Sequence, residues 1–321
     1  MRFRCANLIH YHLINGGYFN ICSLPLLSRA KPSVWTIHDP WPLTGYCIHP
    51  FDCGRWKAGC GECPVFSKNG RPDRTSMMWK IKRWVYQHSD IDVIVASEWM
   101  EKMVEDSPLF GRSRIHLIPF GLDLQTFRPI DGQEAKRKLG VFPGSLVVCF
   151  RATTSEFKGL SFIKECLKRW FPDTRVCLLT FNERGLLDEF RGKYQIIDLG
   201  WVEDEILTVS ALNAADLFLM PSLAETFGMM AIEAMACGKP VIVFEGTALP
   251  EVVFAPRGGI SVPKGDYVAL LNVLKRLARD HNERNTLGEQ ALQLAREHYG
   301  LERYMDRILG LYEEVIARKR A

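Results

Sequence analysis

Short apolar runs alternate with amphipathic stretches along almost the whole chain, and this alternation restricts the folds that it can adopt. Several runs are continuously apolar, as expected of parallel strands that are buried on both faces. Strands that alternate with helices predict a parallel sheet covered by helices, an α/β fold. We expect strands in the first part of the chain at 6–11, 33–38, 92–96 and 115–119, and in the second part at 146–150, 175–180, 195–198, 217–220, 240–244 and 259–262.

A chain of 321 residues is long enough for about two domains, at roughly 150 residues each. A domain boundary is indicated between about 126 and 145, because this segment contains the helix- and strand-breaking residues Pro129, Asp131-Gly132 and Pro143-Gly144. We therefore expect an N-terminal domain over 1–128 and a C-terminal domain over 129–300. The last segment, 301–321, carries a helical apolar stripe and is expected to pack back towards the N-terminal domain.

The formal net charge of +4 is too small to indicate a nucleic-acid partner. The sequence has no run of 18 apolar residues, so a membrane-spanning helix is not expected. Polar residues such as His10, His12 and Asn20 interrupt the apolar stretch near the N-terminus, which disfavours a secretory signal. We expect a cytoplasmic protein whose ten cysteines are reduced.

The strongest chemical signal lies between 220 and 240, where a predicted strand, a loop and a helix follow one another. The loop carries Glu225, and the helix begins near Phe227-Gly228 and carries Glu233. Gly228 permits close approach of a ligand, and the N–H groups of a helix start suit a phosphate. The two carboxylates could accept hydrogen bonds from sugar hydroxyls. The alternative is an ordinary loop with two solvated glutamates, although the apolar neighbours of Glu233 argue against it, because a buried carboxylate needs partners.

A second signal follows the first strand of the second part. Arg151 and Lys158 lie in a predicted strand-to-helix loop, where two cations could neutralise a diphosphate and stabilise its charge as it leaves. A solvated basic loop is the alternative interpretation.

These motifs together resemble family 4 glycosyltransferases. The resemblance covers nearly the whole chain and implies a retaining, nucleotide-sugar-dependent transferase with the GT-B fold, in which two Rossmann-like domains face a cleft. A cysteine cluster after Thr44-Gly45 resembles the subgroup that includes enzymes of exopolysaccharide and colanic-acid-type assembly. The residues that carry the resemblance are 158–159, 215–222, Glu225, Glu233, 236–241 and 249–252 in the second part, and 34–39, 96–99, 118–123 and 127–129 in the first.

The resemblance implies a UDP- or GDP-sugar donor and assigns it to three side chains. Arg151 and Lys158 would hold the donor diphosphate, and Glu233 would bind the ribose hydroxyls. Arg151 stands seven positions before Lys158, where the family spacing is commonly shorter, so the assignment of Lys158 is the firmer one.

The resemblance also implies which groups surround the transferred sugar. Glu225 would contact the donor sugar, with the backbone N–H groups of Phe227, Gly228 and Met229 nearby. His38 matches a histidine at the end of an N-domain strand that faces the reacting sugar; alternatively it caps the neighbouring loop. The acceptor would be a glycan or a lipid-linked sugar in polysaccharide biosynthesis, and transfer would need no catalytic cofactor.

The front of the chain departs from the family. The family's N-terminal domain opens with a strand and a glycine-rich turn that have no counterpart here, so we expect this domain to be incomplete. The alternative function is accordingly a truncated, non-catalytic nucleotide-binding remnant or a subunit that depends on a partner.

Four cysteines, Cys47, Cys53, Cys60 and Cys63, cluster in a stretch without convincing strands or helices. Cys60-Gly-Glu-Cys63 has the spacing of a zinc knuckle, and Cys47 with Cys53 could complete a tetrahedral structural zinc site. Buried free thiols and disulfides are the alternatives. A catalytic metal is not expected, because four thiolates leave no open position.

The segment 77–86 is basic and aromatic and could rest on an anionic membrane surface, which would suit a lipid-linked acceptor. The alternative is a helix that packs Ile81, Trp84 and Val85 inward and exposes Lys82 with the other cations.

Overall fold

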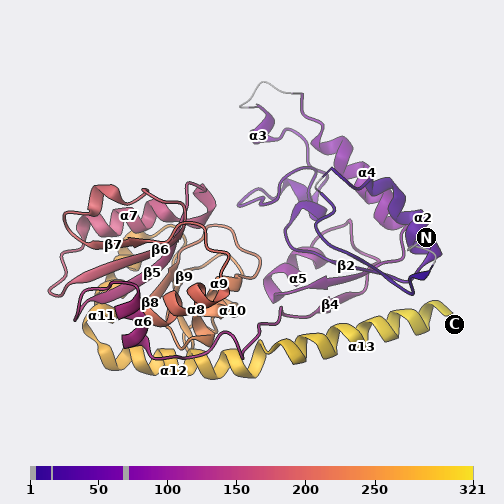
Figure 1. Cartoon of the computed structure of the whole chain (residues 1–321). Coiled ribbons are helices and arrows are strands. Elements are labelled where there is room, and N and C mark those ends of the chain that lie inside the picture. Colours follow the sequence, from indigo (N-terminus) through magenta and orange to yellow (C-terminus); the bar gives the residue numbers. More distant parts are fainter. Residues whose placement is uncertain (1–4, 16, 68–71, 321) are drawn as a thin grey trace. The chain divides into compact units, whose positions relative to one another are not determined.

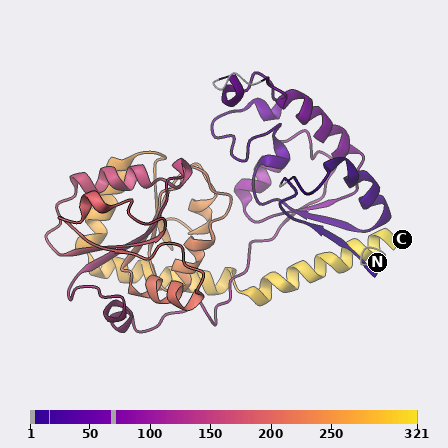
Figure 2. The ribbon, with the colours of Figure 1, turned by 45° about the horizontal axis from the view of Figure 1, so that its top comes forward.

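The computed structural model describes residues 5–15, 17–67 and 72–320. The chain forms two compact units, Met1–Pro119 with Tyr304–Ala321, and Phe120–Arg303. Each unit contains one sheet whose strands are all parallel, with helices on its faces (Figures 1 and 2). We describe the two units separately.

The first unit contains a four-stranded sheet in the order β1-β2-β3-β4. One face packs against the helices α2, Leu24–Ala30, α4, Thr75–Gln87, and α5, Glu98–Glu105, in a core that includes Trp35. Because successive side chains of a strand point to opposite faces, Val34 lies on the other side. The strands are β1, Ile9–Tyr11, β2, Ser33–Thr36, β3, Asp92–Val95, and β4, Ile115–Leu117.

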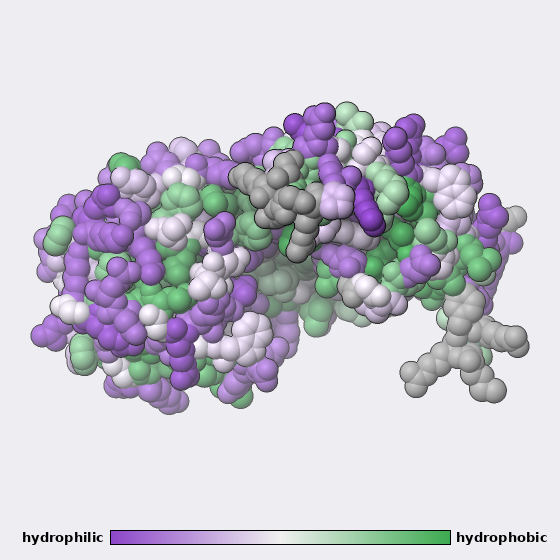
Figure 3. All heavy atoms as spheres, turned by 90° about the horizontal axis from the view of Figure 1, so that it is seen from above, coloured by the Kyte–Doolittle hydropathy of each residue, from purple (hydrophilic) through white to green (hydrophobic). Residues whose placement is uncertain are grey.

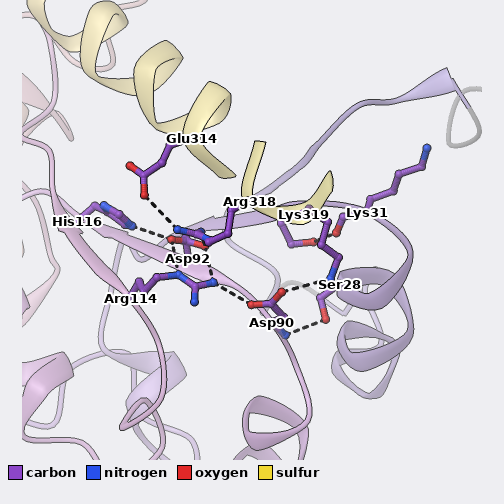
Figure 4. Close-up of polar contacts among 10 residues, drawn as sticks. Ser28, Lys31, Asp90, Asp92, Arg114, His116, Glu314, Arg318 and Lys319 are labelled. Carbon is purple, nitrogen blue, oxygen red and sulfur yellow. Dashed lines mark hydrogen bonds and ion pairs between the residues drawn. The ribbon is translucent and has the colours of Figure 1, made fainter. Parts of the chain in front are cut away.

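The opposite face of this sheet is covered by the C-terminal helix α13, Leu301–Arg320. Its buried stripe of Ile308, Leu311 and Val315 packs against Val34 and Ile94. Figure 4 shows that the end of α13 is also held by charge, because Arg318 binds the buried carboxylate of Asp92 and Lys319 binds Asp90.

The second unit contains a six-stranded sheet in the order β10-β9-β8-β5-β6-β7. One face packs against α7 and α11, while α8 and α9 contact β5 and β8. The strands are β5, Leu146–Ala152, β6, Val176–Asn182, β7, Gln195–Asp198, β8, Leu217–Met220, β9, Val241–Phe244, and β10, Gly259–Val262. The helices are α6, Gly132–Lys138, α7, Leu160–Arg169, α8, Glu205–Ala214, α9, Met229–Ala236, α10, Leu249–Val252, α11, Tyr267–Arg279, and α12, His281–His298.

All ten strands expected from the sequence are present, with ends that differ by at most a few residues, so the predicted parallel α/β architecture is confirmed. Between 40 and 74, the described residues form no strand. They contain only the helical turns η2, Trp41–Leu43, and η3, Arg55–Lys57, and the short helix α3, Pro64–Ser67.

The predicted orientation of α4 is wrong at two positions. Lys82 is fully buried, and Trp84 is 55% exposed. The ammonium of Lys82 donates to the carbonyl oxygens of Trp41 (2.6 Å) and Thr44 (2.8 Å) and lies 3.4 Å from the centroid of the Trp41 ring. These contacts hold a buried amino group that sequence periodicity assigns to the surface, and burial lowers its pKa to about 7.

Among the helices of the described residues, none combines the length and the apolar character that spanning a bilayer requires.

Candidate functional site

The predicted donor residues lie where the strand order of the second unit reverses. From β5 the chain continues to β6 and β7 on one side, and it then returns to β8 on the other side of β5. In open α/β sheets, ligands bind in the crevice outside the carboxyl ends of strands at such a reversal. The loops that follow β5 and β8 carry Lys158 and Glu225, respectively.

An ion pair joins these two loops. Nζ of Lys158 lies 2.7 Å from Oε2 of Glu225, and the side chains are 24% and 15% exposed. The backbones also meet, because Leu223 N–H donates to the carbonyl oxygen of Phe157 at 2.8 Å. Gly159 has a φ of +76°, and a Cβ there would lie 1.9 Å from the carbonyl oxygen of Pro221, so only glycine lets the loops approach this closely.

Helix α9 begins beside this ion pair. Its N-cap is Gly228, with a φ of +107° and no side chain to cap the first turn. Phe227 is buried and makes edge contacts with the rings of Phe120 and Tyr299, which hold the loop before the helix in place. The N–H groups at the start of α9 therefore form a fixed, positively polarised end next to Lys158.

Glu233 lies within α9, surrounded by buried alanine, isoleucine and methionine side chains. Burial, together with the nearby Glu205 carboxylate, raises the pKa of its carboxyl group to about 7. Among the described residues, none forms a hydrogen bond with this carboxyl group. It is thus a half-buried acceptor that lacks a partner from the protein.

Arg151 is oriented by a residue that the sequence interpretation missed. Its Nη2 donates to Oδ1 of Asn182 at 3.0 Å, at the end of the neighbouring strand β6. The next residue, Glu183, accepts hydrogen bonds from the Thr153 hydroxyl (2.5 Å) and the Thr154 N–H (3.0 Å). These contacts fix the loop after β5. The only signal in the sequence is the position of both residues at the carboxyl end of a predicted strand.

The structure thus brings Lys158, Glu225 and the segment Phe227–Met229 together, with Glu233 on α9. Arg151 was expected in the loop before Lys158, but it lies within β5, whose strand extends two residues further than predicted.

His38 belongs to the first unit, where it follows β2. Its Nε2 lies 2.9 Å from Nδ1 of His12, which follows β1. Burial, together with the nearby His12, lowers the pKa of His38 to about 4. The imidazole of His38 is therefore neutral at pH 7.

Cys47, Cys53, Cys60 and Cys63 line one small cavity with Trp56. All four are thiols rather than disulfides, so the disulfide alternative does not describe this structure. The N–H of Gly45 donates to Sγ of Cys60 at 3.2 Å, and burial raises the pKa of Cys47 to about 11. Throughout the described ranges, no group of three or more His, Cys, Asp or Glu side chains is arranged to hold a metal ion. The predicted structural zinc gains no support from this geometry.

The chain has two units, and each contains one parallel sheet. In the second unit, charged loops lie where the strand order reverses. This is the architecture of α/β proteins with the GT-B fold. Two family models match the chain, "Glycosyltransferase Family 4" over residues 2–126 and "Glycosyl transferases group 1" over residues 145–280. The chain belongs to this family of glycosyltransferases and is a transferase. Enzymes of this family generally need no cofactor for transfer.

Relatives and solved structures agree with this assignment. The chain is 24% identical to the colanic acid biosynthesis glycosyl transferase WcaC of Escherichia coli, over 96% of this chain and 76% of WcaC. Sucrose-phosphate synthase from Thermosynechococcus elongatus has a TM-score of 0.73 at 21% identity, over 97% of this chain and 74% of that one. Anabaena HepE, solved with UDP-glucose, has a TM-score of 0.67 at 18% identity, over 96% of this chain and 79% of HepE. The chain spans only 33% to 58% of the length of seven further curated relatives.

Proposed function

We propose that this glycosyltransferase moves a hexosyl group from a UDP- or GDP-sugar to a glycan or lipid-linked acceptor in polysaccharide biosynthesis, with retention of anomeric configuration. The observation that carries the donor assignment is the ion pair of Lys158 and Glu225 beside the uncapped start of α9. The structure of HepE with UDP-glucose, a protein of the same fold, supports a nucleotide-sugar donor.

The diphosphate would lie against Lys158, Arg151 and the N–H groups at the start of α9. An ammonium, a guanidinium and a helix N-terminus all favour a bound dianion, and each hydrogen bond to a charged group contributes about 1.5–3 kcal/mol. Glu225 would accept hydrogen bonds from hydroxyls of the donor sugar while its other oxygen stays on Lys158. Glu233 would accept hydrogen bonds from the ribose hydroxyls, which supply the partner that its carboxyl group lacks in the described protein.

The reaction then needs no strong side-chain base. The acceptor hydroxyl oxygen forms a bond to the anomeric carbon on the face from which the diphosphate leaves, while the bond between that carbon and the phosphate oxygen breaks. The departing phosphate oxygen takes the acceptor's proton. Lys158, Arg151 and the start of α9 stabilise the charge that develops on the diphosphate, and the neutral His38 lines the reacting sugar.

Calorimetric titration of the purified chain with UDP, GDP and their common sugar conjugates tests the donor site. We expect saturable binding of one nucleotide, weakened at least about tenfold in Glu233→Ala, because a lost hydrogen bond to a charged acceptor costs more than 1.4 kcal/mol. Glu189→Ala, which removes an exposed carboxylate paired with Lys164, is the matched control. If the folded chain bound no nucleotide, the proposal would fail and the non-catalytic alternative would be favoured.

We also propose that the face of α4 docks on an anionic lipid surface. Met77 and Trp84 are 51% and 55% exposed, and Lys80 and Arg83 are exposed on the same helix. Neither α4 nor its neighbour α2 contains an acidic residue, and α2 adds the exposed Leu26. Figure 3, which looks down on the molecule from above, shows apolar side chains exposed among hydrophilic ones on the first unit. Aromatic and apolar groups on helices that carry cations and no acidic residue are complementary to negatively charged headgroups.

Co-sedimentation with vesicles tests this docking surface. We expect binding to vesicles that contain phosphatidylglycerol, weaker binding in Trp84→Ala and in Lys80→Ala, and little binding to pure phosphatidylcholine. Trp201→Ala is the control, because Trp201 is 70% exposed in the second unit. Equal binding by Trp84→Ala and the wild type would rule the surface out.

A further inference from the structure

Three histidines form a connected group at the carboxyl ends of β1 and β2. His10 lies within β1, His12 follows it, and His38 follows the neighbouring strand β2. The rings of His10 and His12 have centroids 4.0 Å apart, and those of His12 and His38 are 5.2 Å apart. β1 and β2 pair in parallel, with His10 opposite Val34. The residues that follow the two strands therefore lie at the same edge of the sheet.

The innermost histidine is held at both nitrogens. Nε2 of His10 lies 2.7 Å from the hydroxyl oxygen of Thr36, and Nδ1 lies 2.5 Å from the hydroxyl oxygen of Tyr312 on α13. The ring of His10 is therefore fixed from the adjacent strand and from the C-terminal helix. Its contact with His12 then restricts the second ring, which in turn forms a 2.9 Å hydrogen bond to Nε2 of His38.

We infer that His12 is a positioning residue for His38, a role that rests on the proposed place of His38 beside the reacting sugar. A neutral imidazole has one nitrogen that donates and one that accepts. A hydrogen bond between two neutral rings therefore sets which nitrogen of His38 carries its proton, and it also fixes the ring plane. His12 thereby determines both the orientation and the tautomer that His38 offers to a sugar.

Burial is the main reason that this pair is neutral. Burial is the largest cause of the lowered pKa of His12, and burial followed by His12 is the cause for His38. His10 has a pKa lowered to about 4 by burial and by the other two rings. Asp39, which follows His38 in the sequence, accepts a hydrogen bond from the N–H of Trp41 at 2.8 Å and lies 3.5 Å from the side-chain amide of Asn15. Tyr312 is the titratable group that faces His10 from α13.

The first readout does not require catalysis. We would titrate histidine side chains by NMR in the wild type and in His12→Ala, with the resonances of His38 assigned through His38→Gln. Because His12 depresses the pKa of His38, we expect the His38 pKa to rise in His12→Ala and its tautomer to become mixed. His12→Phe keeps an aromatic ring but removes both ring nitrogens, including the Nδ1 that bonds to His38, so it should also change the tautomer of His38. An unchanged tautomer and pKa of His38 in both variants would overturn the inference.

The second readout is steady-state kinetics with the donor found by titration. We expect kcat to fall roughly 10- to 100-fold in His12→Ala, as for a misplaced reacting group, with an unchanged donor KM. The acid limb of the pH profile should move to higher pH, and His12→Asn should restore part of kcat, since its amide can hydrogen-bond near the position of Nδ1. His88→Ala, at an exposed histidine after α4, is the control. A normal kcat in His12→Ala would contradict the positioning role. Activity absent from the wild type with every donor would instead refute the proposed function and leave the NMR result standing.

Discussion

The ammonium of Lys158 lies 2.7 Å from the carboxylate of Glu225, although 67 residues separate them in the sequence. They meet because β5 and β8 are adjacent parallel strands whose following loops leave from the same edge of the sheet. The pair places one cation and one anion side by side, so a phosphate and a sugar hydroxyl can each find a complementary group at one point.

Replacing Lys158 tests its assignment to the diphosphate. In Lys158→Ala we expect UDP or GDP affinity to fall about 10- to 100-fold, which corresponds to about 1.4–2.7 kcal/mol for a lost charged hydrogen bond. Calorimetry measures the change, and Lys164→Ala, at a cation paired with Glu189, is the control. In Glu225→Gln the free nucleotide should bind at least as tightly as to the wild type, whereas kcat should fall. Equal affinity of Lys158→Ala and the wild type would remove Lys158 from the diphosphate site.

Glu233 should make both nucleotide binding and stability depend on pH. Its pKa is raised from 4.5 to about 7, so the folded ligand-free chain holds a proton that the unfolded chain releases between these values. Stability should therefore decrease as pH rises through this window, and Glu233→Gln should remove that decrease. Nucleotide affinity should increase as pH rises through about 7, because the ionised carboxylate is the better acceptor for ribose hydroxyls.

Thermal unfolding and calorimetry at a series of pH values measure these two effects. Glu189→Gln, at an exposed carboxylate, should keep the pH dependence of the wild type. The assignment would not survive if Glu233→Gln retained the same pH dependence in both measurements.

The sequence was sufficient for the strands, because continuous apolar runs bounded by polar segments allow few other structures. It also located Lys158, Glu225 and the start of α9, since loops after neighbouring strands meet at one edge. It was misleading at Lys82 and Trp84, where two backbone carbonyls and the Trp41 ring hold the buried amino group of Lys82. Periodicity contains no information about such distant partners.

Other contacts could not be predicted for the same reason. The hydrogen bond from Arg151 to Asn182 depends on the pairing of β5 with β6, and the bond between His12 and His38 depends on the pairing of β1 with β2. Each pairing joins residues that have no local pattern in common. The cysteine spacing, in contrast, suggested zinc more strongly than the observed arrangement of thiols does.

Gly159 should be indispensable for the apposition of the two donor loops. Gly159→Ala would place a Cβ 1.9 Å from the carbonyl oxygen of Pro221 and would force a side chain into a left-handed backbone conformation. The conformation alone costs roughly 1–2 kcal/mol, and the clash adds to it. We expect a lower melting temperature and weaker nucleotide binding. Gly192→Ala is the control, since a Cβ there meets no atom within 4 Å. Equal effects of the two substitutions would show that the close approach is not needed.

Asp92 should anchor the C-terminal helix to the first unit. Its carboxylate is 1% exposed and contacts His116 (2.8 Å), Arg114 (3.1 Å) and Arg318 of α13 (Figure 4). Burial raises the pKa of Asp92, but hydrogen bonds from these three side chains outweigh it and lower the pKa to about 2. The ionised carboxylate of Asp92 therefore stabilises the fold fully at pH values above 3.8, the pKa expected in the unfolded chain, and this stabilisation is lost as pH falls through about 2.

Asp92→Asn leaves three cationic or polar side chains without their shared carboxylate. We expect the free energy of unfolding to fall by about 2–3 kcal/mol. This is no more than the smallest losses typical when one partner of a buried ion pair is removed, because the arginines are partly solvated. Asp90→Asn should cost less than about 1 kcal/mol, since Asp90 is 54% exposed where it meets Arg114 and Lys319. Urea unfolding at pH 7 measures both losses, and hydrogen exchange should show α13 opening more often in Asp92→Asn only. If both variants were equally stable, the apolar stripe of α13 alone would hold the helix on the sheet.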